Sequence, residues 1–469
     1  MFDNRCFSLT IPSEGLSLRQ ISAHPSFTLI DGVGICLYDN FLPGCRKNND
    51  CRILERIVKA YKKSDKDILS DLGYHASLII ADCRKNKLLI SSDMVGHFTY
   101  YFAIKNRSVT VSSDISFCSH NLTPDISKES FTKYFLKGYI YGDDTVFSGI
   151  KKIQPGCYLV VDKGKLIVRS YHRYCSKLIF RNEKWFKESI LKGLKDFISV
   201  YAKNRKVGLM LSGGYDSSFL CGKIAKECRE LHTFTLGIES CVSNAVLQSR
   251  KIAKLFKTFH HEINLTNREY VAAFAEVMGY LDEPVFDMDI AIIFSMLGSI
   301  PEDIDFIFHG FGSDELFGDR LKSSTGRYDG RCFYMFAGQK LPQELLLHER
   351  VCSTHHSRLI FPFVAHSMVK LALEMPLGFK QGKNLLRSLA TDLDKVHFEP
   401  NLPVSRIPEL AKKTIIAHYL PKVERSQCLG ALLGKNDLKE ILRRSTNRQI
   451  LSLIVFQVWF ERRFPGIVW

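Results

Sequence analysis

The strongest constraint in this sequence is a glycine- and serine-rich segment between a predicted buried strand and a predicted helix. Residues 206–211 (KVGLML) form a short apolar run typical of a buried strand, and residues 217–230 have the pattern of a helix. Between them lies Ser-Gly-Gly-Tyr-Asp-Ser-Ser, residues 212–218. Its two glycines let backbone N–H groups approach a ligand closely, and the helix N-terminus adds about half a positive charge. This strand–turn–helix unit predicts an anion-binding turn.

The region around this turn alternates predicted strands with predicted helices. Strands are expected at residues 232–238, 260–265 and 305–308, and helices at 245–256 and 268–278. Such alternation predicts a doubly wound, parallel α/β sheet. Ligands bind such sheets at the carboxyl ends of the strands. The two segments that directly follow the strands ending at 211 and 308 are therefore expected to face one cleft.

The first part of the chain has a different pattern. Short segments of β-branched and aromatic residues recur between turn signals, which is typical of an antiparallel β-sandwich. The change of pattern near residue 176 predicts two domains, residues 1–175 and residues 176–469. The strands expected in the first domain are residues 76–80, 87–90, 100–104, 109–111, 158–161 and 166–168.

Composition excludes several classes of protein. Of the 469 residues, 45% are hydrophobic and 24% are charged, which excludes a mostly disordered or fibrous chain. No secretory signal is recognisable, and no run reaches the ~18 apolar residues of a spanning helix, so we expect a cytoplasmic protein with no membrane partner. The 14 cysteines include no C-x2-C pair, so we expect reduced thiols and no zinc site. The excess of 65 Lys and Arg over 49 Asp and Glu suits an anionic partner.

The side chains of the turn indicate a phosphate ligand accompanied by a metal ion. Ser212, Ser217 and Ser218 add hydroxyl donors. Asp216 would repel an anion unless a cation such as Mg²⁺ lies between them. The Lys of a G-x4-G-K-S/T phosphate loop is absent. The alternative interpretation is an ordinary turn in which Asp216 and Ser217 cap the helix.

The turn resembles the pyrophosphate loop (SGGxDSS) of the ATP pyrophosphatases. A second segment, residues 310–318 (GFGSDELFG), follows the predicted strand 305–308 and resembles the GxGxDELFG block of the asparagine synthetase superfamily. The resemblance implies that ATP is cleaved between its α and β phosphates and that AMP is transferred to a carboxylate oxygen of the substrate. An amine would then attack the activated carbonyl.

Further segments extend this resemblance over nearly the whole chain. Residues 91–104 resemble the R-D-x-x-G-x4-Y-Y block of the family's N-terminal domain, with Ser92 in place of the Arg. Residues 282–284 and 358–363 resemble synthetase segments, and Lys383 belongs to a G-K-x-x-L-R block. The resemblance implies a glutamine-amidotransferase-like domain of the Ntn-hydrolase type, followed by an ATP-pyrophosphatase synthetase domain.

The resemblance also implies candidate site residues. Mg²⁺ would be held by Asp216 and Asp314, and Asp314 is a candidate catalytic residue as well; alternatively, it caps the helix that starts at Glu315. The adenine would lie near Leu211, Leu236 and Gly237. The nucleotide-binding set as a whole comprises Leu211, Ser212, Gly213, Gly214, Asp216, Ser217, Ser218, Leu236, Gly237, Gly310 and Phe311.

A Lys that stabilises the acyl-transfer step is expected in this family after the G-K-x-x-L-R block. The candidates here are Lys412 and Lys413, either of which could instead be a solvated surface residue. His260 and His261 lack a third ligand, so we expect core residues there and not a metal site.

Residue 2 departs from the glutamine-dependent members, which need a nucleophilic Cys there. This chain has Phe2, and Cys6 cannot supply both the thiolate and the α-amine. We therefore expect no glutamine hydrolysis and an inactive first domain, with nitrogen supplied by ammonia or by an amine of the substrate. Inactive N-terminal domains are typical of β-lactam, carbapenam and lasso-peptide macrolactam synthetases.

Phe311 bears on the choice among these relatives. Asparagine synthetases usually have Glu at this position and β-lactam synthetases have Tyr, whereas Phe neither donates nor accepts a proton. Phe311 could also simply pack against adenine or substrate. We favour the lasso type, whose partners would be a precursor peptide and a protease or leader-binding protein of the same pathway. The net charge of +16 suits an acidic peptide, but the simpler interpretation of this charge is solvated surface lysines. One alternative is an ammonia-dependent asparagine synthetase-like enzyme or a β-lactam/carbapenam-type synthetase, which would act on a small carboxylate substrate. Another alternative is a nucleotide-binding pseudoenzyme. Nucleic acid is the least expected partner.

Overall fold

The chain forms two compact units. The first comprises Met1–Tyr174, Asp282–Val285 and Gly338–Leu346, and the second comprises the remaining segments. The predicted domains 1–175 and 176–469 stay a prediction, because compactness alone does not test whether each part folds by itself. The computed structural model describes residues 8–11, 28–30, 33–39, 51–63, 76–120, 125–163, 165–171, 178–238, 244–318, 340–380, 383–390, 393 and 409–465.

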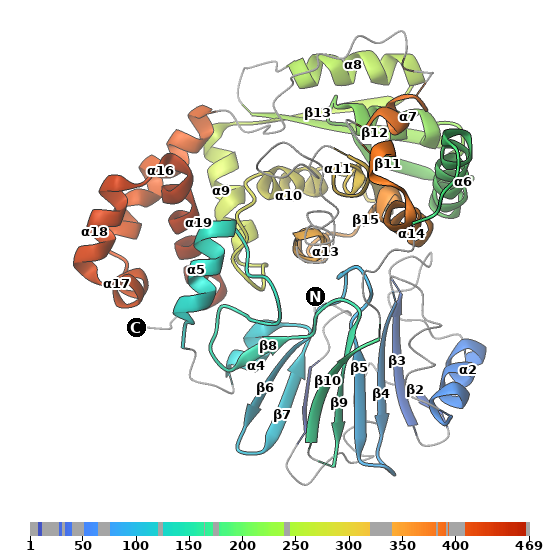
Figure 1. The fold of residues 1–469 in the computed structure, drawn as a ribbon. Coiled ribbons are helices and arrows are strands. Elements are labelled where there is room, and N and C mark those ends of the chain that lie inside the picture. The colour runs from blue at the N-terminus through green and yellow to red at the C-terminus, as the bar shows by residue number, and fades with distance from the viewer. Residues whose placement is uncertain are drawn as a thin grey trace. The chain divides into compact units, whose positions relative to one another are not determined.

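The first unit contains two antiparallel sheets (Figure 1). The smaller has the strand order β1-β7-β6-β8, and the larger has the order β10-β9-β5-β4-β3-β2. In the larger sheet, Ile79 on β4 lies opposite Cys36 on β3 and Ile90 on β5. The strands are β1 (Ser8–Ile11), β2 (Thr28–Ile30), β3 (Val33–Asp39), β4 (Ala76–Asp82), β5 (Lys87–Ser91), β6 (Tyr101–Lys105), β7 (Ser108–Ser112), β8 (Ile150–Lys152), β9 (Cys157–Asp162) and β10 (Lys165–Ser170).

Apolar residues from both sheets share one buried core. Val109 and Val111 of the smaller sheet belong to the same buried cluster as Ile79 and Leu88 of the larger sheet. The other face of the larger sheet packs on helix α2 (Cys51–Tyr61), as Figure 1 also shows. Side chains that alternate between the two faces of a strand can fill both layers. The predicted antiparallel sandwich is confirmed.

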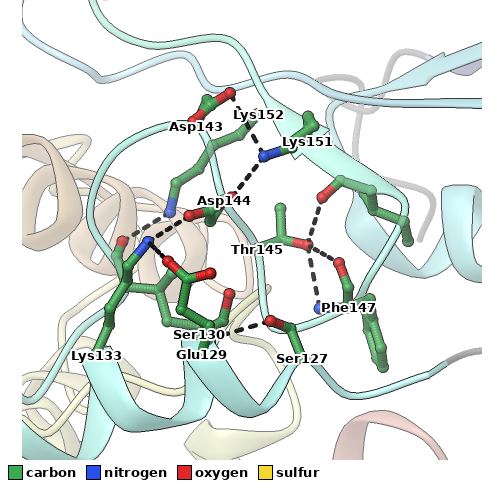
Figure 2. A network of polar contacts seen from close by, with 12 residues as sticks. Ser127, Glu129, Ser130, Lys133, Asp143, Asp144, Thr145, Phe147, Lys151 and Lys152 are labelled. Carbon is green, nitrogen blue, oxygen red and sulfur yellow. Dashed lines mark hydrogen bonds and ion pairs between the residues drawn. The ribbon is translucent and has the colours of Figure 1, made fainter.

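A polar network fixes the segment that follows helix α5 (Lys128–Lys137) in the first unit. Figure 2 shows Lys133 and Lys151 converging on Asp144, with Lys151 Nζ 2.5 Å from the carboxylate. Burial alone would raise the pKa of Asp144, but the two lysines lower it below its ordinary value. Next along the chain, Lys152 forms a buried ion pair of 2.6 Å with Glu283. The first unit also contains a shorter helix, α4 (Ile115–His120), and the first half of α13 (Leu341–Cys352), as far as Leu346.

The second unit is built on a five-stranded parallel sheet with the order β13-β12-β11-β14-β15. The chain starts at the central strand β11, adds β12 and β13 on one side, and then adds β14 and β15 on the other. This reversal creates a topological switch point between β11 and β14, where ligands of such sheets bind. The predicted parallel α/β architecture is confirmed. The strands are β11 (Lys206–Met210), β12 (Glu230–Ile238), β13 (Phe259–Leu265), β14 (Phe306–Phe308) and β15 (Arg358–Ile360).

Helices cover this sheet and extend from it. Strand β12 is buried along nearly its whole length, as expected where both faces are covered. Helices α8 and α10 both pack on β12. The described helices that lie wholly in this unit are α6 (Glu183–Ala202), α7 (Tyr215–Ile224), α8 (Asn244–Phe256), α9 (Asn267–Met278), α10 (Ile290–Gly298), α11 (Ser313–Phe317), α14 (His366–Glu374), α15 (Asn384–Arg387), α16 (Glu409–Glu424), α17 (Gln427–Leu433), α18 (Lys435–Arg444) and α19 (Asn447–Arg463). The second half of α13, from Leu347 to Cys352, also belongs to it.

Helix α7 differs in both of its ends from the helix predicted at residues 217–230. It begins earlier because Gly214 serves as its N-cap residue. It ends earlier because the backbone N–H groups of Arg229 and Glu230 donate to the Arg205 carbonyl, which draws the chain into β12. In the described part of the chain, no helix has both the length and the hydropathy needed to cross a membrane.

Candidate functional site

The turn after β11 depends on a glycine in the left-handed region. Gly213 has φ +72°, which disfavours any residue with a side chain. A Cβ atom there would also lie 3.0 Å from the Ala245 carbonyl carbon and closer still to its oxygen. Because the clashing atoms belong to the Ala245 backbone, they cannot move aside by a side-chain rotation. The tight approach of this turn to α8 therefore requires glycine.

The serines of the turn hold its shape. The hydroxyls of Ser212 and Ser217 lie 2.8 Å apart, and the Ser218 hydroxyl donates to the Gly214 carbonyl at 2.8 Å. No side chain caps α7, because its N-cap residue is Gly214. The alternative in which Asp216 and Ser217 cap this helix is therefore wrong. An uncapped helix N-terminus beside a glycine turn suits an anionic ligand.

Asp216 and Asp314 converge on one cation, the ammonium of Lys383. Lys383 Nζ lies 2.6 Å from Asp216 Oδ2 and also contacts Asp314 Oδ1. The Ser313 hydroxyl donates to the other oxygen of Asp216 at 2.8 Å. Asp216 follows β11 and Asp314 follows β14, so the two carboxylates flank the switch point of the sheet. The predicted pair is thus brought together, with a lysine between its members.

Burial and charge act against each other in this cluster. The Lys383 side chain is only 6% exposed, whereas Asp216 and Asp314 are 21% and 29% exposed. Burial opposes the charge of Lys383, but the two carboxylates raise its pKa above the ordinary value. Burial raises the pKa of Asp216, and repulsion by Asp314 adds to this, while Lys383 acts in the opposite direction. The cluster therefore strongly favours a cation between its two carboxylates.

Asp314 is not the cap of its helix. The N-cap residue of α11 is Gly312, with φ +93°, and its backbone N–H donates to the Glu315 carboxylate at 3.0 Å. Glu315 is buried, whereas Asp314 turns its carboxylate to Lys383. The cap interpretation of Asp314 is therefore wrong, and its carboxylate contacts Lys383 and not the helix N-terminus.

The carboxylate pair fits a hard divalent cation. Mg²⁺ is typically held by one or two carboxylates together with phosphate oxygens and water. Among the described residues, no group of three or more His, Cys, Asp and Glu side chains forms a metal cage. Asp216 and Asp314 would thus supply only part of the coordination sphere of Mg²⁺, and oxygens of water or of a ligand would complete it. This donor set is the one expected for a metal that arrives with a nucleotide.

Comparison with known proteins identifies the family. A glutamine amidotransferase domain model matches residues 44–172, and an asparagine synthase model matches residues 200–320. Together the two matches cover more than half of the chain, and the amidotransferase match precedes the synthase match. The chain belongs to the asparagine synthetase superfamily. The second match contains both carboxylates and the turn that follows β11.

Several curated relatives have the same family name. Asparagine synthetase 1 of Bacillus subtilis is 24% identical over 327 residues, which are 69% of this chain and 46% of that protein. A Methanocaldococcus jannaschii protein, named provisionally as a glutamine-hydrolyzing asparagine synthetase, is 24% identical over 58% of this chain and 54% of its own length. The asparagine synthetase of Mus musculus is 26% identical over 51% of this chain and 48% of its own length. The chain thus spans about half the length of the curated relatives that it matches.

The synthetase region also contains the residues predicted to surround the adenine. The Leu211 backbone is fully engaged: its N–H donates to the Phe234 carbonyl at 2.8 Å, and its carbonyl accepts from Thr235 and Ser249. Leu236 is buried near the carboxyl end of β12, and Gly237 follows it. This binding role stays a prediction, in which Leu211 would contribute shape and not backbone hydrogen bonds.

Phe311 lies in an aromatic cluster beside the carboxylates. Its ring packs at 5.0 Å from His348 and at 5.8 Å from Phe361, and its N–H donates to His309 Nδ1 at 3.1 Å. The preceding Gly310 approaches α7 closely, since a Cβ there would lie 3.4 Å from the Ser217 nitrogen. The Phe311 side chain itself is apolar and supplies neither a proton donor nor a proton acceptor at this position.

The structure does not join Lys412 or Lys413 to this cluster. Both lie on α16, which packs on α9 and α19, and Lys412 forms an ion pair of 2.6 Å with Glu409. Lys413 is exposed. Neither lysine makes a described hydrogen bond or ion pair with Asp216 or Asp314, so their catalytic role stays a prediction.

Sequence reasoning missed Lys383 as a site residue. The available signal was the G-K-x-x-L-R block, which marks the lysine but does not say what it contacts. Lys383 takes a left-handed conformation (φ +56°) just before α15, and its N–H donates to the Lys380 carbonyl. Tyr215 tethers the other end of α15, because its hydroxyl donates to the Arg387 carbonyl at 2.6 Å.

The amidotransferase match includes the predicted block at residues 91–104. Ser92, which replaces the family's Arg, is buried and donates to the Phe98 carbonyl at 2.6 Å. Asp93 is buried and accepts hydrogen bonds from four consecutive backbone N–H groups, from Val95 to Phe98. Phe2 and Cys6 lie outside the described residues.

Proposed function

We propose that this protein is an ATP-dependent ligase that adenylates a carboxylate, releases pyrophosphate, and joins the activated carbonyl to an amine. The observation that carries the proposal is the convergence of Asp216 and Asp314 beside the glycine turn at the switch point of the parallel sheet. A structural ion pair alone does not require the uncapped helix N-terminus next to it. The family and its curated relatives support the same reaction class.

Different residues of the site would bind different parts of the Mg²⁺–triphosphate. The backbone N–H groups of Gly213 and Gly214 and the N-terminus of α7 would hold the β and γ phosphates. Asp216 and Asp314 would hold Mg²⁺, which when bound neutralises charge on the phosphates and on the departing pyrophosphate. Lys383, whose ammonium contacts both carboxylates, would add a second positive charge by turning to a phosphate oxygen.

The carboxylate oxygen of the substrate would attack the α-phosphorus in line with the pyrophosphate leaving group, giving an acyl-adenylate. The amine would then attack the acyl carbon, and AMP would leave with the bonding electrons of the acyl–oxygen bond. Phe311 cannot accept the proton that the amine loses. That proton must pass to another group or to solvent. Lys412 and Lys413 remain the candidates for stabilising the oxyanion of this step.

For the substrate we propose a peptide that supplies both carboxylate and amine, as in lasso-type macrolactam formation. Phe311 supports this choice, because a folded peptide already places its amine next to the activated carbonyl and relies less on a catalytic base. The net charge of +16 suits an acidic precursor peptide. A leader-binding protein or protease of the same pathway would be the protein partner.

The test is a panel of substrates with separate assays for pyrophosphate, phosphate, AMP and ADP. The panel holds peptides with an internal Asp or Glu and a free N-terminus, aspartate with ammonium, and a β-amino acid. AMP and pyrophosphate formed only with peptides, together with a product lighter by one water, would support the macrolactam proposal. Turnover with aspartate and ammonium or with the β-amino acid would overturn the peptide assignment. ADP and phosphate as products, or no turnover by protein that binds ATP, would overturn the adenylating ligase.

A further inference from the structure

The carboxylates of Asp216 and Asp314 already have a positively charged partner, the ammonium group of Lys383. Lys383 neutralises one of the two negative charges of Asp216 and Asp314 and contacts both carboxylates at once. A divalent ion that used the same two carboxylates would meet this ammonium at its own position. Two cations at such a short separation repel each other strongly, even at the effective dielectric constant of a protein surface.

The position of Lys383 is built into the backbone. Its left-handed φ of +56° is uncommon for a residue with a long side chain and persists only where the surroundings impose it. Its stem passes directly over Gly318, where a Cβ atom would lie 2.7 Å from Lys383 Cε and closer to Cγ. The absence of a side chain at Gly318 thus leaves space for the aliphatic stem of Lys383. The Lys383 side chain is buried there, so it is not an ordinary solvent-exposed lysine.

We propose that Lys383 keeps the carboxylate pair closed to metal until a nucleotide offers the ammonium a phosphate in exchange. This inference rests on the proposed function, because it takes the pair to be the Mg²⁺ site of a nucleotide-binding cleft. Without nucleotide, Lys383 is the counter-ion of Asp216 and Asp314. When the triphosphate enters beside α7, the flexible lysine end swings to a phosphate oxygen. The two carboxylates then face Mg²⁺, so metal and nucleotide bind together and neither is held alone.

The distinguishing measurement is metal binding in the absence of nucleotide, followed as loss of the free Mn²⁺ electron paramagnetic resonance signal. The wild-type protein is expected to bind Mn²⁺ only weakly at this pair. Lys383→Met should bind Mn²⁺ at least tenfold more tightly, since it frees both carboxylates. Lys383→Met combined with Asp314→Asn should lose that gain. Lys439→Met, an exposed lysine on α18, is the matched control and should behave like the wild type.

Equal Mn²⁺ affinity in the wild type and in folded Lys383→Met would overturn the proposal, and so would tight Mn²⁺ binding by the nucleotide-free wild type. If Lys383→Met does not fold, Lys383→Gln replaces it, because a neutral amide can still donate to the carboxylates without competing with a metal. The same gain is expected from this variant, and its absence would equally overturn the proposal. Metal exclusion can hold even if no substrate yields pyrophosphate, so its outcome is separate from that of the ligase assay.

Discussion

Gly318 and Lys383 lie so close together that the first cannot bear a side chain without displacing the second. A Cβ atom on Gly318 would come within 2.7 Å of Lys383 Cε and closer to Cγ. Gly318 is the last residue of the GFGSDELFG block, and Lys383 belongs to the block that precedes α15. The two sequence blocks thus meet at the carboxylate pair.

Gly318→Ala should therefore disturb the site more than the fold. The flexible lysine stem can move, so we expect a modest loss in the free energy of unfolding, of about 1–2 kcal/mol. Displacement of the ammonium should weaken Mg·ATP binding about tenfold. Gly378→Ala is the control, because a Cβ atom at Gly378 meets nothing within 4 Å. Equal nucleotide affinity in the two variants, measured by calorimetry, would contradict the role given to this approach.

Gly213→Ala should be more damaging than Gly318→Ala, because the new Cβ atom would clash with the backbone carbonyl of Ala245, which cannot rotate away. We expect ATP binding to be lost and the free energy of unfolding to fall by more than the ~1 kcal/mol typical of a left-handed φ alone. Gly142→Ala separates the two effects, because Gly142 also has a positive φ (+83°) but open space around it. If chemical denaturation gave the same loss for both variants, the contact with Ala245 would have no energetic consequence.

Lys380 predicts a pH dependence of stability. Burial lowers its pKa to about 7, and its Nζ donates to the Ala372 carbonyl. In the unfolded chain its pKa is about 10.4, so between these values the unfolded state binds more protons. The cost of burying the charged lysine is therefore fully present below pH 7 and disappears as the pH rises toward 10.4.

Lys380→Met should accordingly gain stability relative to the wild type at pH 6.5, and the gain should shrink by up to about 1.4 kcal/mol per pH unit above pH 7. Urea unfolding of both proteins at pH 6.5, 8 and 9.5 measures this slope. Lys439→Met serves as the exposed comparison and should show no such trend. A stability difference independent of pH would mean that Lys380 stays charged in the folded protein.

The features of the fold and the site that depend on neighbouring residues in the sequence could be predicted, whereas those that depend on contacts between distant residues could not. The turn at residues 212–218 and the alternation of strands and helices are local patterns, and both are confirmed in the structure. The N-cap residues of α7 and α11 are harder to predict from the sequence. They are Gly214 and Gly312, and the nearby Asp216 and Asp314 contact Lys383 instead of capping these helices. That meeting joins residues 167 positions apart. It depends on how α15 docks on the start of α7 through Tyr215, which no local periodicity encodes.

The central claim is that Asp216 and Asp314 form the metal-dependent nucleotide site, and it can be tested before any substrate is known. The measurement is calorimetric binding of a non-hydrolysable ATP analogue, with and without Mg²⁺, to the wild type, Asp314→Asn and Asp303→Asn. Asp303 is a surface acid that pairs with Lys206 and serves as the control. We predict Mg²⁺-dependent binding to the wild type and the Asp303 variant, and at least tenfold weaker binding to Asp314→Asn. Unchanged, Mg²⁺-dependent affinity in a folded Asp314→Asn protein would contradict the account.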